Sequence, residues 1–317
     1  MQNDNKKVLI TGGVGFIGSH LASRLNSEGY QVIALDNMST GNPLNLAGEK
    51  GITIVEGDCR DVATLVPERV GLILHLGIAS TTTLYLKDRN LVSKEIQGAM
   101  AIYEKAIKDG AKVVIASSSS LYNLGNLPSR ERDIIQVTDF YTECRYAIER
   151  MAKLYSDIYG MKAVVLRMFA VYGGIGEVYK KQYANMVTKL TWQILQGQNP
   201  RVYGDGKQTR DFTYISDVLN AWDRAIEYKD SGFAVFNVGT GKQTDFIKLI
   251  KMIQKKAGTN LTIEHEDNPL PNFVHDTCAN TDWARKKLKF KAEVDLAKGI
   301  DLLLLTSTVL IEKVGKI

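Results

Sequence analysis

Short runs of consecutive apolar residues alternate, along the first half of the chain, with amphipathic stretches of helical period. The apolar runs are expected to be strands: Lys7–Thr11, Gln31–Leu35, Ile52–Glu56, Leu72–Leu76, Lys112–Ser117 and Ala163–Arg167. Helices are expected between most of them: Phe16–Glu28, Val92–Lys108 and Tyr141–Tyr159. Nearly continuous apolar strands separated by helices are typical of a parallel sheet covered on both faces. The pattern therefore predicts a doubly wound α/β domain.

Beyond about residue 170 this alternation weakens. Shorter elements are expected there: helices at Tyr183–Gln196, Ser216–Tyr228 and Asp245–Lys256, and strands at Phe233–Val238 and Leu261–Glu264. The chain shows no internal repeat and no low-complexity linker. We therefore expect two domains, residues 1–170 with the parallel sheet and residues 171–317 as a smaller mixed α/β lobe, with some segments of the second returning to the first.

Composition and charge exclude several classes of protein. The 317 residues include 40 Lys and Arg against 35 Asp and Glu, and the net charge of +5 is spread along the chain. Nucleic-acid binding favours a concentrated basic face, so no nucleic-acid partner is expected. The apolar run Leu302–Ile311 is shorter than the ~20 residues that cross a bilayer, and an amphipathic helix without a membrane is expected. Three cysteines without metal-type spacing, and an N-terminus without a signal peptide, predict a cytoplasmic protein with no metal site.

A glycine-rich turn follows the first predicted strand directly and opens a helix. The sequence there is Gly12-Gly-Val-Gly15-Phe-Ile-Gly18. In a dinucleotide-binding turn, such glycines allow the tight bend, the approach of the diphosphate and close helix packing. The phosphates then lie on free N–H groups at the positive end of the helix. The strand–turn–helix context predicts a dinucleotide site, and glycines in an ordinary turn are the competing interpretation.

An acidic residue ends the second predicted strand. Asp36 lies a little more than the ~20 residues downstream at which a carboxylate is expected to hold the adenosine ribose. Residues 37–48 contain no Lys or Arg that could bind a 2′-phosphate. The sequence therefore favours NAD over NADP. A loop cap is the alternative role for Asp36.

Ser118 and Tyr141 are candidates for proton transfer. Ser118 stands at the end of the fifth strand, and Tyr141 opens a helix with Arg145 four residues later on the same face. Tyrosine ordinarily titrates near pH 10, so it acts as a base at neutral pH only where fixed cations favour its phenolate. Arg145 and a bound nicotinamide would both do so. A core tyrosine and a solvated serine loop are the alternative interpretation.

With these motifs the chain resembles extended short-chain dehydrogenase/reductases, specifically the sugar-nucleotide epimerase/dehydratase branch, over nearly its whole length. The segments Thr11-Gly-Gly-Val-Gly-Phe-Ile-Gly-Ser-His20, Asp36-Asn-Met-Ser-Thr-Gly41, Gly57-Asp-Cys59, His75-Leu-Gly77 and Tyr203-Gly-Asp-Gly-Lys-Gln-Thr-Arg-Asp-Phe212 carry the resemblance. It implies a Rossmann-type doubly wound parallel sheet with NAD, a smaller mixed α/β substrate-binding lobe, and a nucleotide sugar as substrate. It also implies a homodimer, through long helices that start near Asp88 and Tyr141.

The resemblance implies roles for individual residues. The implied cofactor contacts are Gly12, Gly15, Phe16, Ile17, Gly18, Asp36, Asn37, Ser39, Thr40, Gly41, Asp58, Cys59, Leu76, Gly77, Tyr141 and Arg145. The implied substrate contacts are Ser80, Ser118, Asn185, Tyr203 and Arg210. Arg210 also suits a diphosphate on physical grounds, because its guanidinium is planar and permanently charged. A surface ion pair with Asp205 or Asp211 is the other interpretation of Arg210.

Four positions depart from the family pattern. Arg145 replaces the lysine that normally contacts the cofactor ribose and favours the phenolate. Ala170 replaces an asparagine, Leu270 a second phosphate-binding arginine, and Glu95 another asparagine. These changes bear on the substrate more than on the cofactor.

The residues after Ser118 bear on the reaction. Family dehydratases carry an acidic pair there, where this chain has Ser119 and Ser120. The resemblance thus implies epimerisation, most commonly at sugar C4 of a UDP-sugar, with Ser118, Tyr141 and Arg145 as the catalytic group. A dehydratase, reductase or simple NAD dehydrogenase on the same frame, and a non-catalytic NAD-binding sensor, are the alternatives.

Overall fold

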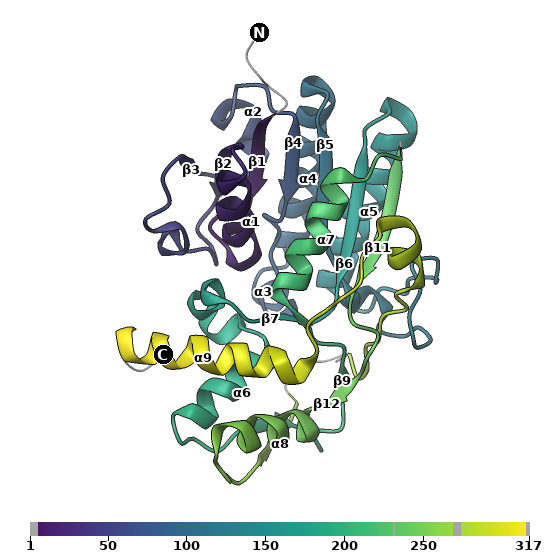
Figure 1. Cartoon of the computed structure of the whole chain (residues 1–317). Coiled ribbons are helices and arrows are strands. Elements are labelled where there is room, and N and C mark those ends of the chain that lie inside the picture. Colours follow the sequence, from purple (N-terminus) through teal and green to yellow (C-terminus); the bar gives the residue numbers. More distant parts are fainter. Residues whose placement is uncertain (1–5, 231, 269–273, 315–317) are drawn as a thin grey trace.

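The computed structural model of the chain, which describes residues 6–230, 232–268 and 274–314, is built around a seven-stranded parallel sheet (Figure 1). The strands are β1 (Lys7–Thr11), β2 (Gln31–Asp36), β3 (Ile52–Glu56), β4 (Leu72–His75), β5 (Lys112–Ser118), β6 (Ala163–Met168) and β11 (Phe233–Val238). Their spatial order is β11-β6-β5-β4-β1-β2-β3, and every neighbouring pair is parallel. The doubly wound α/β prediction is confirmed.

Helices cover both faces of this sheet, as strands that are apolar throughout require. α1 (Phe16–Ser27) and α7 (Ile215–Glu227) share one apolar core with the sheet, in which Trp222 is fully buried. α4 (Leu91–Asp109) and α5 (Phe140–Tyr159) share a core on the opposite face, centred on the fully buried Tyr103. Successive residues of β1 alternate between the two cores, with Leu9 on one side and Ile10 on the other.

A second group of helices packs beside the carboxyl ends of the strands (Figure 1). It consists of α6 (Met186–Leu195), α8 (Phe246–Ala257) and α9 (Leu296–Val314), which surround a separate apolar core. Three small sheets accompany them: β7 (Val171–Tyr172) with β10 (Thr213–Tyr214), β8 (Arg201–Tyr203) with β13 (Glu264–Glu266), and β9 (Thr209–Arg210) with β12 (Thr244–Asp245). Shorter helical turns are η2 (Pro43–Leu46), η3 (Cys59–Asp61), α2 (Val62–Leu65), α3 (Thr82–Lys87), η4 (Ser119–Tyr122), η5 (Ile175–Tyr183) and the π-helical η6 (Ala284–Leu288).

Two elements from the second half of the chain belong to the main sheet. β11 extends it next to β6, and α7 packs on β5 and β6 beside α1. The expected return of a strand to the sheet is therefore observed, and a helix accompanies it.

Two expected elements differ in position. The predicted strand Leu261–Glu264 is observed at Glu264–Glu266, because the Gln254 side chain bonds both the N–H and the carbonyl of Leu261 and so occupies its backbone. The predicted helix Tyr183–Gln196 begins only at Met186, because the Asn185 side chain accepts the Val187 N–H and caps it.

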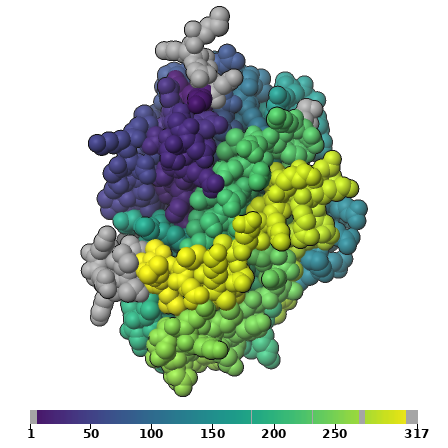
Figure 2. All heavy atoms as spheres, in the orientation of Figure 1, coloured from purple at the N-terminus to yellow at the C-terminus, as the bar shows by residue number. Residues whose placement is uncertain are grey.

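The apolar run near the C-terminus lies within α9, as expected of a helix. Figure 2 shows α9, in yellow, along the surface between the sheet domain and the green α8. Within the ranges that the structure describes, no helix combines the length and apolar character that crossing a bilayer would need.

Candidate active site

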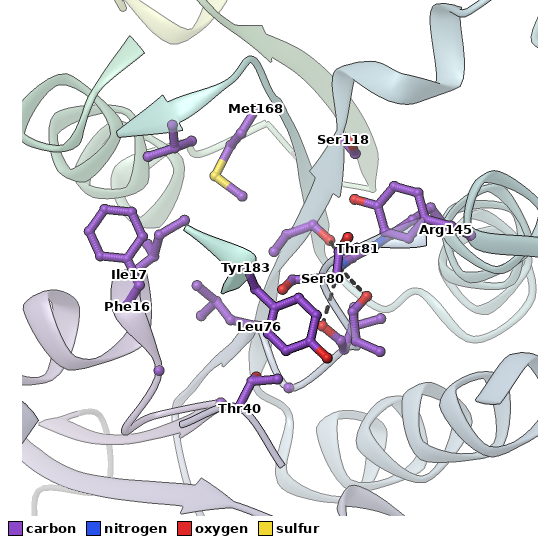
Figure 3. A pocket seen from close by; sticks show the side chains of 18 of the residues that line it. Phe16, Ile17, Thr40, Leu76, Ser80, Thr81, Ser118, Arg145, Met168 and Tyr183 are labelled. Carbon is purple, nitrogen blue, oxygen red and sulfur yellow. Dashed lines mark hydrogen bonds between the residues drawn. The ribbon is translucent and has the colours of Figure 1, made fainter. Parts of the chain in front are cut away.

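A cavity of about 460 Å³ opens where the strand order reverses between β1 and β4, at the carboxyl ends of the strands. Its lining includes the residue at or just after the end of five strands: Gly12, Asp36, Leu76, Ser118 and Met168. In open α/β sheets this reversal point is where ligands bind. Figure 3 shows Phe16 and Ile17 on one side of the cavity and Ser118 and Arg145 on the other.

The glycine-rich turn between β1 and α1 fits the diphosphate of a dinucleotide. A Cβ on Gly18 would collide with the carbonyl oxygen of Gly12, so only glycine lets the first turn of α1 lie this close to the end of β1. Gly12, Gly15, Phe16, Ile17 and Gly18 all line the cavity. Gly15 caps α1 without a side-chain bond, so the N–H groups of the first turn remain available to phosphate oxygens.

Asp36 forms the adjacent part of the cavity wall. Its carboxylate is buried and accepts the Val14 N–H at 3.2 Å and the Met38 N–H at 2.9 Å. Burial raises the pKa of this carboxyl, and the two backbone bonds oppose the shift. Each carboxylate oxygen keeps lone pairs for a ribose hydroxyl. Lining residues that the sequence had placed beside it are Asn37, Ser39, Thr40 and Gly41.

The ends of β1 and β4, which form the base of the cavity, are connected through the side chain of Thr11. The Thr11 hydroxyl lies 2.8 Å from Nδ1 of His75 and accepts the N–H groups of Leu76 and Gly77. Cys59 lines the base and its thiol faces the Gly77 carbonyl at 3.8 Å. Burial raises the pKa of the Cys59 thiol to about 12, so it acts as an apolar, protonated group.

Ser118 and Tyr141 both line the cavity. Tyr141 is the second residue of α5, whose start is fixed by reciprocal bonds between Asp139 and Thr142. The positive end of this helix favours a negative charge on a residue in its first turn. Ser118 Oγ accepts the Ser120 N–H at 3.1 Å, which leaves its own proton free to be donated. The pair can therefore exchange a proton with a ligand hydroxyl.

Arg145 lies beneath the Tyr141 ring, with its guanidinium carbon 5.3 Å from the ring centre. It is 5% exposed, and its two terminal nitrogens donate to backbone carbonyls. These acceptors are Ala116 at 2.8 Å, Ile78 at 3.2 Å and Ala79 at 3.1 Å. The structure thus brings Arg145 to Tyr141 as the sequence predicts, but its terminal nitrogens bond to the loop after β4 and to strand β5. Its Nε is buried without a partner among the described residues.

Glu95 approaches the same loop from α4. Its carboxylate accepts the Ala79 N–H at 3.1 Å while Arg145 holds the Ala79 carbonyl. Burial raises the pKa of Glu95, and the Ala79 bond and Arg145 oppose the shift. Two of the departures from the family pattern therefore act together on one segment of the cavity wall.

The predicted substrate contacts are only partly gathered. Ser80, Ser118, Asn185 and Arg210 line the cavity, whereas Tyr203 does not. Asp58, which was predicted as a cofactor contact, does not line it either. Asp58 caps η3 and pairs with Arg60, and the Tyr203 carbonyl accepts a bond from Gln208.

The Arg210 guanidinium donates to the carbonyls of Thr209, Val274 and His275. Burial lowers its pKa to about 10, so it remains a cation. Asp205, one of the two carboxylates considered as its partner, pairs with Lys207, and Asp211 accepts bonds from Thr240 and its neighbours.

Ala170 and Leu270 are the two remaining positions that depart from the family pattern. Ala170 lines the cavity with φ of +26°, a left-handed backbone that asparagine tolerates better than alanine. Leu270 lies outside the described residues.

Several lining residues were not identified from the sequence as site residues. They include Glu95, Asp139, Met168, Lys180, Tyr183, Val274 and Thr277. Lys180 lies in a polar stretch of the sequence, and no pattern there marks it as a site residue. Figure 3 shows the Tyr183 side chain projecting into the cavity from the same stretch.

Comparisons with known proteins agree with this geometry. The model of the NAD dependent epimerase/dehydratase family matches residues 8–239. UDP-glucuronate 4-epimerase 4 of Arabidopsis thaliana is 30% identical over 333 residues, which cover 94% of this chain and 74% of that protein. UDP-N-acetyl-alpha-D-glucosaminuronate decarboxylase of Bacillus cytotoxicus is 31% identical over 271 residues, 82% of this chain and 83% of that protein. The crystal structure of UDP-glucose 4-epimerase from Thermotoga maritima with UDP-glucose superposes with a TM-score of 0.89 at 27% identity, over 96% of this chain and 99% of that one.

Replacing Asp36 should weaken NAD binding selectively. In Asp36→Asn the N–H acceptor is kept in part, but the charged acceptor for the ribose hydroxyls is lost, so we expect the Kd for NAD to rise about 10- to 100-fold. The Kd for NADP should change less, because the variant no longer repels a 2′-phosphate. Titration calorimetry with both dinucleotides measures the ratio. An equal change for the two would contradict a ribose-binding role.

Proposed function

Because this chain belongs to the NAD-dependent epimerase/dehydratase family, we propose that it is an epimerase that inverts one hydroxyl-bearing carbon, C4, of a UDP-linked sugar. The observation that carries the proposal is the set of acidic and hydroxyl groups around Tyr141. Positions 119 and 120 hold serines that line the cavity, where a dehydratase needs an acidic pair. Epimerisation needs only one proton acceptor, because the same group takes the proton and gives it back.

The carboxylates that line the cavity are already engaged elsewhere. Asp36 accepts two backbone N–H groups beside the glycine turn, and Glu95 accepts the Ala79 N–H. Asp139 accepts the Thr142 N–H at 2.7 Å as the cap of α5. None of these three carboxylates directly follows Ser118, where family dehydratases carry their acidic pair, which favours epimerisation over dehydration.

In the proposed mechanism Tyr141, as phenolate, takes the proton from the C4 hydroxyl while Ser118 donates a hydrogen bond to the same oxygen. NAD, when bound, supplies the hydride acceptor and later the hydride donor, which makes it a recycled cofactor. Arg145 favours the phenolate through its charge and holds the cavity wall by its three carbonyl bonds. After the keto sugar has turned over in the cavity, its opposite face would be presented to the hydride donor, and Tyr141 returns the proton to the C4 oxygen.

The nucleotide must remain held while the sugar turns. Arg210 and Asn185 also line the cavity, and Arg210 is a half-buried cation suited to a diphosphate. Binding energy that comes from the nucleotide end of the substrate leaves the reacting sugar free to rotate.

The deciding experiment incubates the full-length protein and NAD with UDP-, dTDP-, GDP- and CDP-sugars, among them UDP-glucose and UDP-glucuronic acid. Products are separated by chromatography and weighed by mass spectrometry. A product of unchanged mass with inverted C4, and no net NADH, supports the epimerase. Loss of water indicates a dehydratase, loss of carbon dioxide a decarboxylase, and net NADH a dehydrogenase. No conversion, together with no thermal shift beyond that of NAD alone, favours a sensor.

We also propose that two copies associate through α4 and α5, which pack side by side on one face of the sheet. These helices carry solvent-exposed apolar side chains: Met100 at 36%, Leu154 at 49%, Ile158 at 65% and Tyr159 at 61% exposure. A self-complementary patch of this kind suits a two-fold interface. Sedimentation should give a dimer for the parent chain and a monomer for Leu154→Glu. A monomeric parent chain at micromolar concentration would contradict the proposal.

A further inference from the structure

Lys180 is a cavity-lining cation without a role in the mechanism above. It lies in η5, between β7 and α6, and is only partly exposed. Among the residues that the structure describes it has neither a hydrogen-bond partner nor an ion-pair partner, unlike Arg145 and Arg210. A half-buried cation that faces a cavity without a partner is suited to an anionic ligand.

The position of Lys180 relates it to the glycine turn rather than to the sugar. Its ammonium nitrogen lies 5.9 Å from the centre of the Phe16 ring. Phe16 is the first residue of α1 and follows Gly15 directly, so Lys180 faces the helix end at which a dinucleotide diphosphate is expected. The lysine reaches the cavity from η5, which follows β7 in the chain and is a segment separate from the glycine turn.

The segment that carries Lys180 is fixed by a buried carboxylate. Glu177 accepts the Gly173 N–H at 2.8 Å, the Asn185 N–H at 2.6 Å and the Thr188 hydroxyl at 2.6 Å. Through these bonds Glu177 connects the residue that precedes η5 with the start of α6. The two ends of the intervening segment are therefore held close together. Lys180 is therefore presented from a braced segment and not from a free loop.

The same segment also docks closely on α1. A Cβ on Gly176 would lie 3.2 Å from the Ser19 hydroxyl and 3.3 Å from the Phe16 carbonyl oxygen, which is tighter than ordinary packing. Glycine at this position lets η5 lie against the first turns of α1. Lys180, Glu177 and Gly176 thus form one strap, residues 175–183, that crosses from the substrate lobe to the cofactor turn.

We propose that Lys180 binds the diphosphate of NAD from the side opposite the glycine turn, so that the strap holds the cofactor in place. The backbone N–H groups of α1 offer partial positive charge to the diphosphate, and Lys180 adds a full charge. Burial lowers the pKa of Lys180, with Arg145 and Lys189 acting in the same direction and Glu177 opposing them. A bound diphosphate would reverse that balance. The inference rests on NAD binding and is independent of the proposed epimerisation.

The rate at which NAD leaves the full-length holoprotein tests the proposal without any turnover. Protein loaded with radiolabelled NAD is mixed with excess unlabelled NAD, and retained label is followed by rapid filtration. We expect Lys180→Met to release NAD at least tenfold faster than the parent chain, and Lys180→Arg to lie within about threefold of it. Release from the parent chain should accelerate with salt more steeply than release from Lys180→Met.

Lys189→Met is the matched control, because Lys189 neighbours the same Glu177 but does not line the cavity. It should release NAD at the parent rate, and circular dichroism confirms that each variant is folded. Titration of the holoproteins with UDP and with uridine separates the two diphosphates that the cavity could receive. An unchanged rate of NAD release in Lys180→Met would overturn the proposal. If UDP binding were weakened in that variant, the lysine would be assigned to the nucleotide sugar. If UDP binding were also unchanged, Lys180 would be a solvated side chain without a ligand. If Lys180→Met does not fold, the Lys180→Gln variant takes its place under the same criteria.

Discussion

Tyr141→Phe should lower the turnover number by about 10²–10⁴-fold while NAD and the nucleotide sugar remain bound. The substitution removes one oxygen from a buried ring that packs edge-on against Tyr85, so packing is preserved. What is lost is the group that takes the proton from the sugar hydroxyl. The turnover number with the sugar identified by the substrate panel is measured by product chromatography, and the binding of NAD by calorimetry.

Tyr85→Phe provides a matched control for this variant. Tyr85 contacts the Tyr141 ring and is fully buried, but its hydroxyl faces the Cys144 sulfur and the Ala79 carbonyl, each at 3.4 Å, and Tyr85 itself does not line the cavity. Its loss should change turnover by less than about threefold. Retention of more than a tenth of the parent turnover in Tyr141→Phe would exclude Tyr141 as the proton acceptor. A similar loss in both variants would indicate a packing effect instead.

The parts of the fold that the sequence predicts are those set by neighbours in the chain. β1, the glycine turn and α1 follow one another within residues 7–27, and alternating burial along β1 appears directly as an apolar run. Asp36 was identified for the same reason, because it ends a strand and its backbone partners include Met38, two residues away. The NAD expected from it agrees with the NAD dependence of the family.

The parts that could not be predicted depend on contacts between distant segments. The sequence places Arg145 one turn after Tyr141, but its bonds to Ile78 and Ala79 span 67 and 66 positions of the chain. No local sequence pattern specifies whether such a guanidinium will bond to a cofactor hydroxyl or to a backbone carbonyl. The displaced strand β13 has the same origin, because the Gln254 side chain decides where the backbone after Leu261 is free to pair.

Lys180 shows the limit of charge as a signal. No sequence pattern marks Lys180 as a residue that lines the cavity, and the segment that carries it is braced by Glu177, which bonds to Gly173, Asn185 and Thr188. A buried carboxylate in a polar stretch has no sequence signature of its own. Which positively charged side chains line the cavity is therefore determined by the tertiary structure and cannot be read from the composition.

Arg145→Met should reduce the free energy of unfolding by on the order of 3–5 kcal/mol, because it removes one member of a buried, hydrogen-bonded charge system. The Ala116, Ile78 and Ala79 carbonyls lose the hydrogen bonds that Arg145 donates, and Glu95 loses a cation that opposes the effect of burial on its pKa. Arg145→Lys keeps the charge and should cost less. Urea unfolding of the two variants, followed by fluorescence, measures the difference.

Glu95 decides whether this loss reflects charge or only missing hydrogen bonds. Burial already holds the folded pKa of Glu95 above its ordinary value, so a carboxylate there costs stability as the pH rises through the titration of the unfolded and then the folded group. Without Arg145 that cost grows, and we expect the destabilisation of Arg145→Met to be larger at pH 8 than at pH 5. The double variant Arg145→Met/Glu95→Gln keeps an acceptor for the Ala79 N–H and removes the charge, so it should recover part of the stability at pH 8 and none at pH 5. Equal losses at both pH values, with no recovery in the double variant, would show that Arg145 acts through its carbonyl bonds alone, and Glu95 would then have no part in positioning the cavity wall.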